Sequence, residues 1–206
     1  MALRRIFTSM LRRRSSLKRS RFTHPSMFQT KPVVVQTSNF GGAQGTPFND
    51  NNAATNFPNT DPGLTIDPMH PIKQIDIYAG WVVDTISTTY RLSDGTTKVM
   101  KRGSNQTAAN LHSVVLKDNE IISQICGFAG PYQYYNNSLL IQLQLVIFDT
   151  QTGAVRVAGP FGGLNGLASG QLFSVSNPMA LAGFETAGSP QTGISGLSIV
   201  KNNMAE

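Results

Sequence analysis

Cysteine, histidine and long apolar runs are scarce in this sequence, and each scarcity excludes a class of protein. The chain has 206 residues but one cysteine, Cys126, so a disulfide framework within the chain and a multi-cysteine zinc site are excluded. We read Cys126 as a core residue. His24, His70 and His112 lack ligand spacing to one another, so we expect no metal site and no cofactor. No run approaches the roughly 20 apolar residues of a membrane-spanning helix, so no span is expected.

Charge is also scarce, and its distribution divides the chain in two. Residues 1–32 hold nine of the 17 basic residues and no acid, whereas the other eight basic residues face all 11 acids, a net charge of −3 for residues 33–206. The sequence therefore predicts a basic arm, 1–32, and one globular domain, 33–206, that offers no basic field to a phosphate backbone. If the arm binds a polyanion, the residues that would bind it are its arginines, Arg4, Arg5, Arg12, Arg13, Arg14, Arg19 and Arg21.

The arm has three readings. Its apolar residues between Leu3 and Leu11 gather on one helical face, and the segment lacks acids, which is typical of a mitochondrial presequence. It is also similar in composition to a permanent arm that binds RNA, DNA or another anionic surface. A solvated tail without a role is the third reading. The first predicts a mitochondrial protein, and the others a cytoplasmic protein or part of an assembly.

The globular part has the composition and periodicity of an all-β fold. Its many glycines and prolines, 19 and 11 in the whole chain, punctuate short strands, and Leu139–Phe148 alternates apolar residues with glutamines. Ile72–Leu92 predicts a hairpin, and the turn residues Asp149–Gly153 predict another with a return strand at Ala154–Ala158. Between Lys31 and Pro71 we expect one early strand and a surface loop, Asn49–His70. Further strands are predicted at Ser113–Leu116, Glu120–Cys126, Gln171–Val175, Met179–Phe184 and Ile194–Val200.

Chemistry-bearing residues are sparse in the globular part. Its carboxylates lie mostly at strand ends or in turns, where they commonly cap backbone amides; the examples are Asp84, Asp94, Asp118, Glu120 and Asp149. No convergent nucleophile and base, or pair of carboxylates, is apparent, so we expect no enzyme. Tyr132, Tyr134 and Tyr135, followed by Asn136 and Asn137, form an aromatic segment suited to sugar or protein contact.

The order of several motifs resembles the jacalin-related lectin family. The resemblance runs from about Phe40 to Val200 and includes the paired glycines Gly41-Gly42, the strand that begins Val83-Asp84-Thr85-Ile86, and Gly127-Phe128-Ala129-Gly130. Its most specific piece is the glycine-proline-aromatic-glycine turn, Gly159-Pro160-Phe161-Gly162. The resemblance implies a β-prism I, in which three small antiparallel sheets surround a shared apolar core and loops at one end carry a sugar site without a metal.

The same resemblance implies which residues would form that site. They are Gly41 and Gly42 in the early loop, Phe128 and Gly130 in the Gly-x-x-Gly turn, and Thr192, Gly193 and Ser195 in the late loop. Ser195 stands where the family carries an aspartate in a Gly-x-x-x-Asp loop, and a serine lacks the charge and the two oxygens that hold adjacent hydroxyls. We therefore expect sugar binding to be weak or altered.

Two functions follow from these observations. The first is a non-catalytic lectin-like domain whose partner is a glycan or glycoprotein. The second is a structural or assembly protein that uses the same scaffold, forms a homo-oligomer or binds a protein partner, and binds a polyanion through its arm.

Overall fold

The computed structural model describes residues 34–57, 63–104, 110–163, 169–186 and 193–202, and most of this part of the chain is strand. The predicted basic arm lies outside these residues. The described elements are β1 (Val34–Gln36), β2 (Phe40–Gly41), β3 (Thr46–Asn49), α1 (Asp50–Ala54), β4 (Ile72–Ala79), β5 (Val83–Arg91), β6 (Thr97–Gly103), β7 (Asn110–Val115), β8 (Glu120–Tyr132), the 3₁₀ turn η1 (Gln133–Tyr135), β9 (Asn137–Asp149), β10 (Val155–Phe161), β11 (Gln171–Ser176), β12 (Pro178–Glu185) and β13 (Ile194–Asn202).

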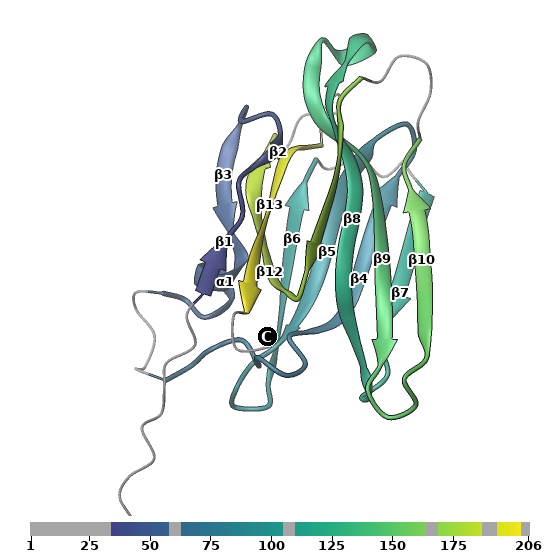
Figure 1. Cartoon of the computed structure of the whole chain (residues 1–206). Coiled ribbons are helices and arrows are strands. Elements are labelled where there is room, and N and C mark those ends of the chain that lie inside the picture. The colour runs from purple at the N-terminus through teal and green to yellow at the C-terminus, as the bar shows by residue number, and fades with distance from the viewer. Residues whose placement is uncertain (1–33, 58–62, 105–109, 164–168, 187–192, 203–206) are drawn as a thin grey trace, which may run out of the picture. The chain divides into compact units, whose positions relative to one another are not determined.

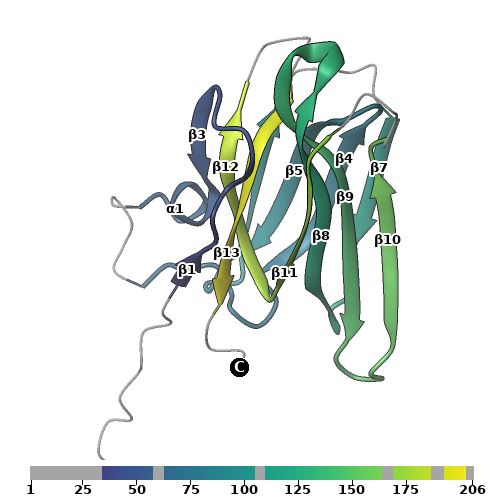
Figure 2. The ribbon, with the colours of Figure 1, turned by 45° about the horizontal axis from the view of Figure 1, so that its top comes forward.

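The strands form three antiparallel sheets around one core (Figures 1 and 2). The first sheet has the order β1-β13-β12-β3, with β2 also paired to β13. The second has the order β10-β9-β8-β11 and the third β6-β5-β4-β7. This arrangement confirms the predicted all-β prism of three antiparallel sheets.

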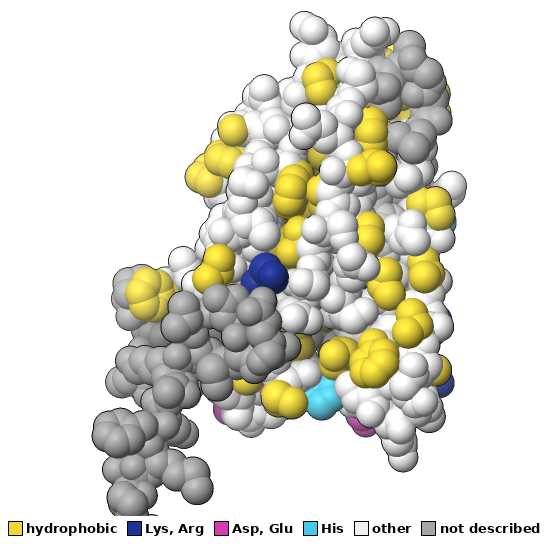
Figure 3. All heavy atoms as spheres, viewed as in Figure 1, with side chains coloured by type: hydrophobic (Ala, Val, Ile, Leu, Met, Phe, Trp, Pro, Cys, Tyr) yellow, Lys and Arg dark blue, Asp and Glu magenta, His cyan; other side chains and the backbone are white. Residues whose placement is uncertain are grey.

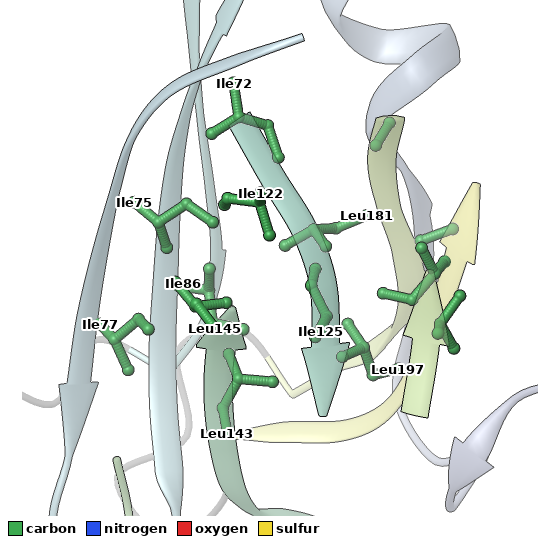
Figure 4. Close-up of a cluster of buried hydrophobic side chains, with 14 of the residues drawn as sticks. Ile72, Ile75, Ile77, Ile86, Ile122, Ile125, Leu143, Leu145, Leu181 and Leu197 are labelled. Carbon is green, nitrogen blue, oxygen red and sulfur yellow. The ribbon is translucent and has the colours of Figure 1, made fainter. Parts of the chain in front are cut away.

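The inward faces of all three sheets meet in a shared apolar core. Figure 4 shows side chains of the second and third sheets pointing toward Leu181 of β12 and Leu197 of β13, which belong to the first sheet. Period-two alternation produces these faces, because successive side chains of a strand point to opposite sides. In β9, Leu143 and Leu145 are buried, whereas Gln142 and Gln144 lie half-buried on the outer face. Charged side chains are few on the described face shown in Figure 3.

Both predicted hairpins are present. β4 pairs with β5, and β9 pairs with β10 across a turn in which the Asp149 carboxylate accepts hydrogen bonds from the amides of Gln151 and Thr152, each at 2.9 Å. The five shorter predicted strands correspond to β7, β8, β11, β12 and β13. β6 is an additional strand that the sequence reading missed, since its lysines, arginine and threonine give no apolar alternation on this exposed sheet edge.

Two predicted turns are wrong. Gly127–Gly130 is not a turn but continues β8 to Tyr132, and Gly127 makes room for the Phe173 ring of β11, whose Cζ atom would lie 2.4 Å from a Cβ there. Gly159–Gly162 is also not a tight turn: its first three residues belong to β10, whose register shifts between Ala158 and Phe161. In both places tertiary packing decides how the glycines are used.

Two further expectations need correction. The segment expected to hold one strand and a loop instead contains β1, β2, β3 and α1, a helix capped by the Asn49 side chain, which accepts the Asn52 amide at 3.3 Å. Cys126 is not a core residue but half-buried on the outer face of β8, where its Sγ lies 3.8 Å from the Ser174 Oγ. Its neighbour Ile125 occupies the inward position, so strand alternation turns Cys126 outward.

Candidate functional site

Several connections meet at one end of the prism, at the top of Figure 1. The β4–β5 connection, Gly80–Val82, lies there, as does the η1 turn between β8 and β9. β6 ends at this end of the molecule, and β13 begins there. Loops on a rigid sheet scaffold are where binding residues concentrate, so the side chains that these connections bring together form the candidate site.

Aromatic rings from two of the connections pack together. The Trp81 ring meets Tyr134 edge-on at a centroid distance of 5.5 Å, and Tyr134 meets Tyr135 edge-on at 5.0 Å. Tyr135 in turn stacks on Tyr132 at 5.4 Å. Trp81 and Tyr134 remain 56% and 64% exposed, whereas Tyr132 is fully buried. We call Trp81, Tyr134 and Tyr135 the aromatic cluster.

A second, smaller apolar core supports this aromatic cluster. It consists of Val82, Tyr132, Leu139 and Ile141, with Phe128 and Tyr135 packed against it. Asn136 closes the η1 turn in the left-handed conformation, with φ of 49°, and its amide donates to the Gln133 carbonyl at 3.1 Å. The exposed rings therefore stand on a rigid base, which lowers the conformational entropy that a ligand would have to remove on binding.

The Asp84 carboxylate lies beside this cluster. Burial raises the pKa of Asp84 to about 6. The pKa of the Tyr135 hydroxyl is also raised, mainly by the burial of Tyr135 itself and next by the negative charge of Asp84. No side-chain or backbone group among the described residues donates a hydrogen bond to this carboxylate. Asp94 and Asp149 behave differently: backbone amides bind both, and hydrogen bonds lower the pKa of both. Asp84 thus departs from the predicted capping role of the turn carboxylates, as does Asp118, which forms an ion pair with Arg91 at 3.2 Å.

Two segments contact the backbone of Asp84. Its carbonyl accepts the Ser104 amide at 3.0 Å, just after the end of β6. The chain also passes so close at Gly193 that a Cβ there would lie 2.6 Å from the Asp84 Cα. Of the residues expected at the sugar site, Gly193 is therefore the one that the structure places against Asp84.

Three of the other expected residues meet at a different place, beside β2. Gly41, Gly42 and Ser195 come together, since the Gly42 amide donates to the Ser195 carbonyl at 2.7 Å and Gly41 pairs with Gly196. Gly41 and Gly130 line a groove of about 470 Å³ between β2 and β8. Phe128 lies on the outer face with the second apolar core, and Thr192 is outside the described residues.

Ser195 has no hydroxyl available for a sugar. Its side chain is fully buried, and its Oγ lies within hydrogen-bonding distance of the Gln44 and Phe184 carbonyl oxygens, the latter at 3.1 Å. The hydroxyl proton is therefore used inside the protein, where it links β13 to the end of β12 and to the segment before β3. The late-loop position that the resemblance implied is structural in this chain.

The sequence patterns do not assign Trp81 or Asp84 to the site, although a signal for both is present. Gly80-Trp81-Val82-Val83-Asp84 has the same Gly-x-x-x-Asp pattern that the resemblance places in the late loop. The predictions for Asp84 are a place in a strand motif and a capping role, neither of which is a ligand contact. The aromatic segment at Tyr132–Tyr135 was recognised, but the sequence could not show that it meets Trp81.

The described part of the chain offers neither a metal site nor a membrane-spanning helix. No group of three or more histidine, cysteine, aspartate or glutamate side chains there could hold a metal ion. Within the same residues, no helix is long and apolar enough to cross a membrane. The arginines of the predicted arm lie outside the described residues, so their polyanion-binding role stays a prediction.

Comparison with known proteins agrees with this architecture. The model of the jacalin-like lectin domain matches residues 37–192, and no curated protein matches the chain. Three solved structures are similar to this chain. The Malaysian banana lectin is 21% identical with a TM-score of 0.57, and the match covers 82% of this chain and 97% of that one. A mannose-specific jacalin-related lectin from Morus nigra in complex with mannose is 14% identical with a TM-score of 0.61 (coverage 87% and 99%), and an artocarpin–mannotriose complex is 17% identical with a TM-score of 0.58 (coverage 81% and 95%).

Identities this low show a shared fold, while the family model covers most of the chain. It matches the part that contains the early glycines, the aromatic cluster and Asp84. The chain therefore belongs to the family of jacalin-like lectin domains.

Proposed function

We propose that this protein is a non-catalytic glycan-binding lectin whose sugar site is formed by Asp84 and the aromatic cluster, rather than by the Ser195 loop. The observation that carries this proposal is a half-buried carboxylate that no described residue pairs, beside exposed aromatic rings. Burying such a group costs stability unless a partner satisfies it, so its persistence at a loop end indicates a ligand.

The chemistry of the two parts suits a sugar. A carboxylate accepts hydrogen bonds through two oxygens and can hold two adjacent hydroxyls of one ring. An aromatic face packs against the apolar C–H face of the same ring, and Trp81 and Tyr134 have large exposed surfaces for this contact. Together they would recognise a hexose by its hydroxyl pattern and by its apolar side.

The same site is poorly suited to catalysis. Hydrolysis of a glycosidic bond uses a pair of carboxyl groups on either side of that bond. Burial accounts for the raised pKa of Asp84, with no contribution from a second carboxylate. Binding without turnover is therefore the expected activity. Mannose is the first ligand to try, because the Morus nigra relative binds it.

The test is titration calorimetry of the full chain with mannose and mannotriose, combined with a glycan array. We expect Trp81→Ala to weaken binding by at least about tenfold, since it removes a central aromatic contact. Phe57→Ala is the matched control, because Phe57 is an equally exposed aromatic residue (65%) that lies outside the site.

Two results would contradict the proposal. One is the absence of binding to any glycan on the array by the wild-type protein. The other is a Trp81→Ala variant that binds as tightly as Phe57→Ala.

A further inference from the structure

A cluster of buried charges lies at the end of β6, the strand end that contacts the Asp84 backbone. Arg102 of β6 donates from Nε to the Asp50 carboxylate at 2.7 Å and from a terminal nitrogen to the Glu185 carboxylate at 3.4 Å. Asp50 belongs to α1 and its side chain is fully buried, and Glu185 is the last residue of β12. One guanidinium therefore joins two carboxylates from elements that are far apart in the sequence.

Further contacts fix Asp50 and Arg102 in this cluster. The Tyr90 hydroxyl donates to Asp50 at 2.9 Å and accepts the Leu181 amide at 3.0 Å. The Arg102 guanidinium lies 5.1 Å from the centre of the Phe48 ring. Arg102 is thus held by Asp50 and Phe48, and it in turn holds Glu185 in one orientation.

Glu185 connects this cluster to the site. Its second carboxylate oxygen accepts the backbone amide of Gly103. Gly103 has φ of 109° and comes so close to β5 that a Cβ there would lie 2.2 Å from the Asp84 carbonyl oxygen. The next residue, Ser104, donates its amide to that same carbonyl oxygen. Two consecutive hydrogen bonds therefore lead from the Glu185 carboxylate to the Asp84 backbone.

Glu185 is also adjacent to a second contact with Asp84. The next residue, Thr186, donates its amide to the Gly193 carbonyl at 3.2 Å, and Gly193 packs against the Asp84 backbone. Glu185 therefore binds one of the contacts of Asp84, at Gly103, through its side chain and adjoins the partner of the other, Thr186, along the chain. A buried ion pair is a costly way to hold two strands together, since apolar residues of the same volume often do so with greater stability. What charged groups add is a specific geometry for the backbone amides that they bind.

We infer that Glu185 is a positioning residue for the glycan site, which fixes the orientation of the Asp84 carboxylate through Gly103 and Ser104. This inference rests on the proposed function of Asp84. It predicts that the hydrogen-bond acceptor at position 185, rather than the negative charge, is what the site needs.

Two variants separate these roles. Glu185→Ala removes the acceptor and should weaken glycan affinity by about tenfold, because a binding group about 1 Å out of place loses most of its contribution. Glu185→Gln keeps an amide oxygen that can accept the Gly103 amide, so it should stay within about threefold of the wild-type protein. Both affinities are measured by calorimetry at a temperature where circular dichroism shows each variant to be folded.

Glu120→Ala is the matched control for general destabilisation. Glu120 is also a buried carboxylate that binds an arginine, Arg156, at 2.8 Å and accepts a backbone amide, that of Lys117, at 3.0 Å. It lies at the other end of β8, about 40 Å from Tyr132 at the usual rise per residue. Its loss should lower thermal stability without changing glycan affinity.

A second measurement does not depend on a sugar. The Asp84 carboxyl pKa, about 6 in this structure, can be followed by NMR titration. Glu185→Ala should lower this pKa toward its ordinary value, because the loosened backbone at Gly103 and Ser104 admits water to Asp84. Glu185→Gln and Glu120→Ala should leave the pKa nearly unchanged. The inference is overturned if Glu185→Ala changes neither the titration nor the affinity, or if Glu185→Gln matches Glu185→Ala in both. A wild-type protein that binds no glycan would refute the proposed function, while the titration would still decide the role of Glu185.

Discussion

Replacing Asp84 with asparagine should make the protein more stable while abolishing glycan binding. Burial raises the pKa of Asp84 from 3.8 to about 6, and that difference corresponds to about 3 kcal/mol of unfavourable free energy for the ionised form. Because the side chain remains partly exposed, solvent screening reduces the expected gain to about 1 kcal/mol. In a domain of this size such a gain raises the melting temperature by about 2–4 °C.

The pH dependence of this gain follows from linkage. A carboxyl group with a raised pKa in the folded state costs stability above that pKa, and the cost disappears as the pH falls through about 6 toward 3.8. The stabilisation by Asp84→Asn should therefore be largest at neutral pH and small near pH 4. Urea unfolding of both proteins at the two pH values measures it.

Asp94→Asn provides the comparison with the opposite sign. Hydrogen bonds from Thr96 lower the pKa of the Asp94 carboxyl, so its ionised form is favoured in the folded state, and its replacement should give no gain at neutral pH. The reasoning about Asp84 is refuted if Asp84→Asn destabilises the protein at neutral pH, or if it stabilises the protein equally at both values.

Three further predictions concern the site and the arm. Glycan affinity should fall as the pH drops below about 6, because a protonated Asp84 loses its charge and one acceptor position; calorimetry across pH 5–8 tests this, and a flat profile would contradict it. Ser195→Asp should destabilise the fold by about 3 kcal/mol or more without creating a sugar site, since a carboxylate there would be buried against the Gln44 and Phe184 carbonyls; unchanged urea unfolding together with improved binding would argue against this. Deletion of residues 1–32 should remove salt-sensitive retention on heparin, since this segment holds nine of the 17 basic residues; equal retention of the shortened and full chains would exclude a polyanion-binding arm.

The sequence by itself determined the fold class and most of the strands. Alternation such as that of Leu139–Phe148 is a local property, because side chains on a strand repeat every two residues whatever the strand packs against. The order of the glycine motifs was likewise enough to indicate the family. Turn chemistry was also local, as the carboxylate of Asp149 shows by binding the two amides that follow it.

The tertiary structure decided how individual residues are used. Gly127 was expected in a turn, but the approach of Phe173 from a strand more than 40 residues away keeps it in β8. Ser195 was expected at the sugar site, but its side chain is fully buried and its hydroxyl is used by the Gln44 and Phe184 carbonyl groups. Burial and hydrogen-bond partners depend on residues that are distant in the sequence, so no local pattern could reveal them.

The site itself shows the same division. The sequence shows that the chain has Trp81, Asp84 and Tyr134, and it predicts a contact surface at the aromatic segment. Their meeting at one end of the prism depends on the β4–β5 and β8–β9 connections, which belong to different sheets. The sequence determined which chemical groups the protein has, and the packing of three sheets decided which of them can hold a ligand together.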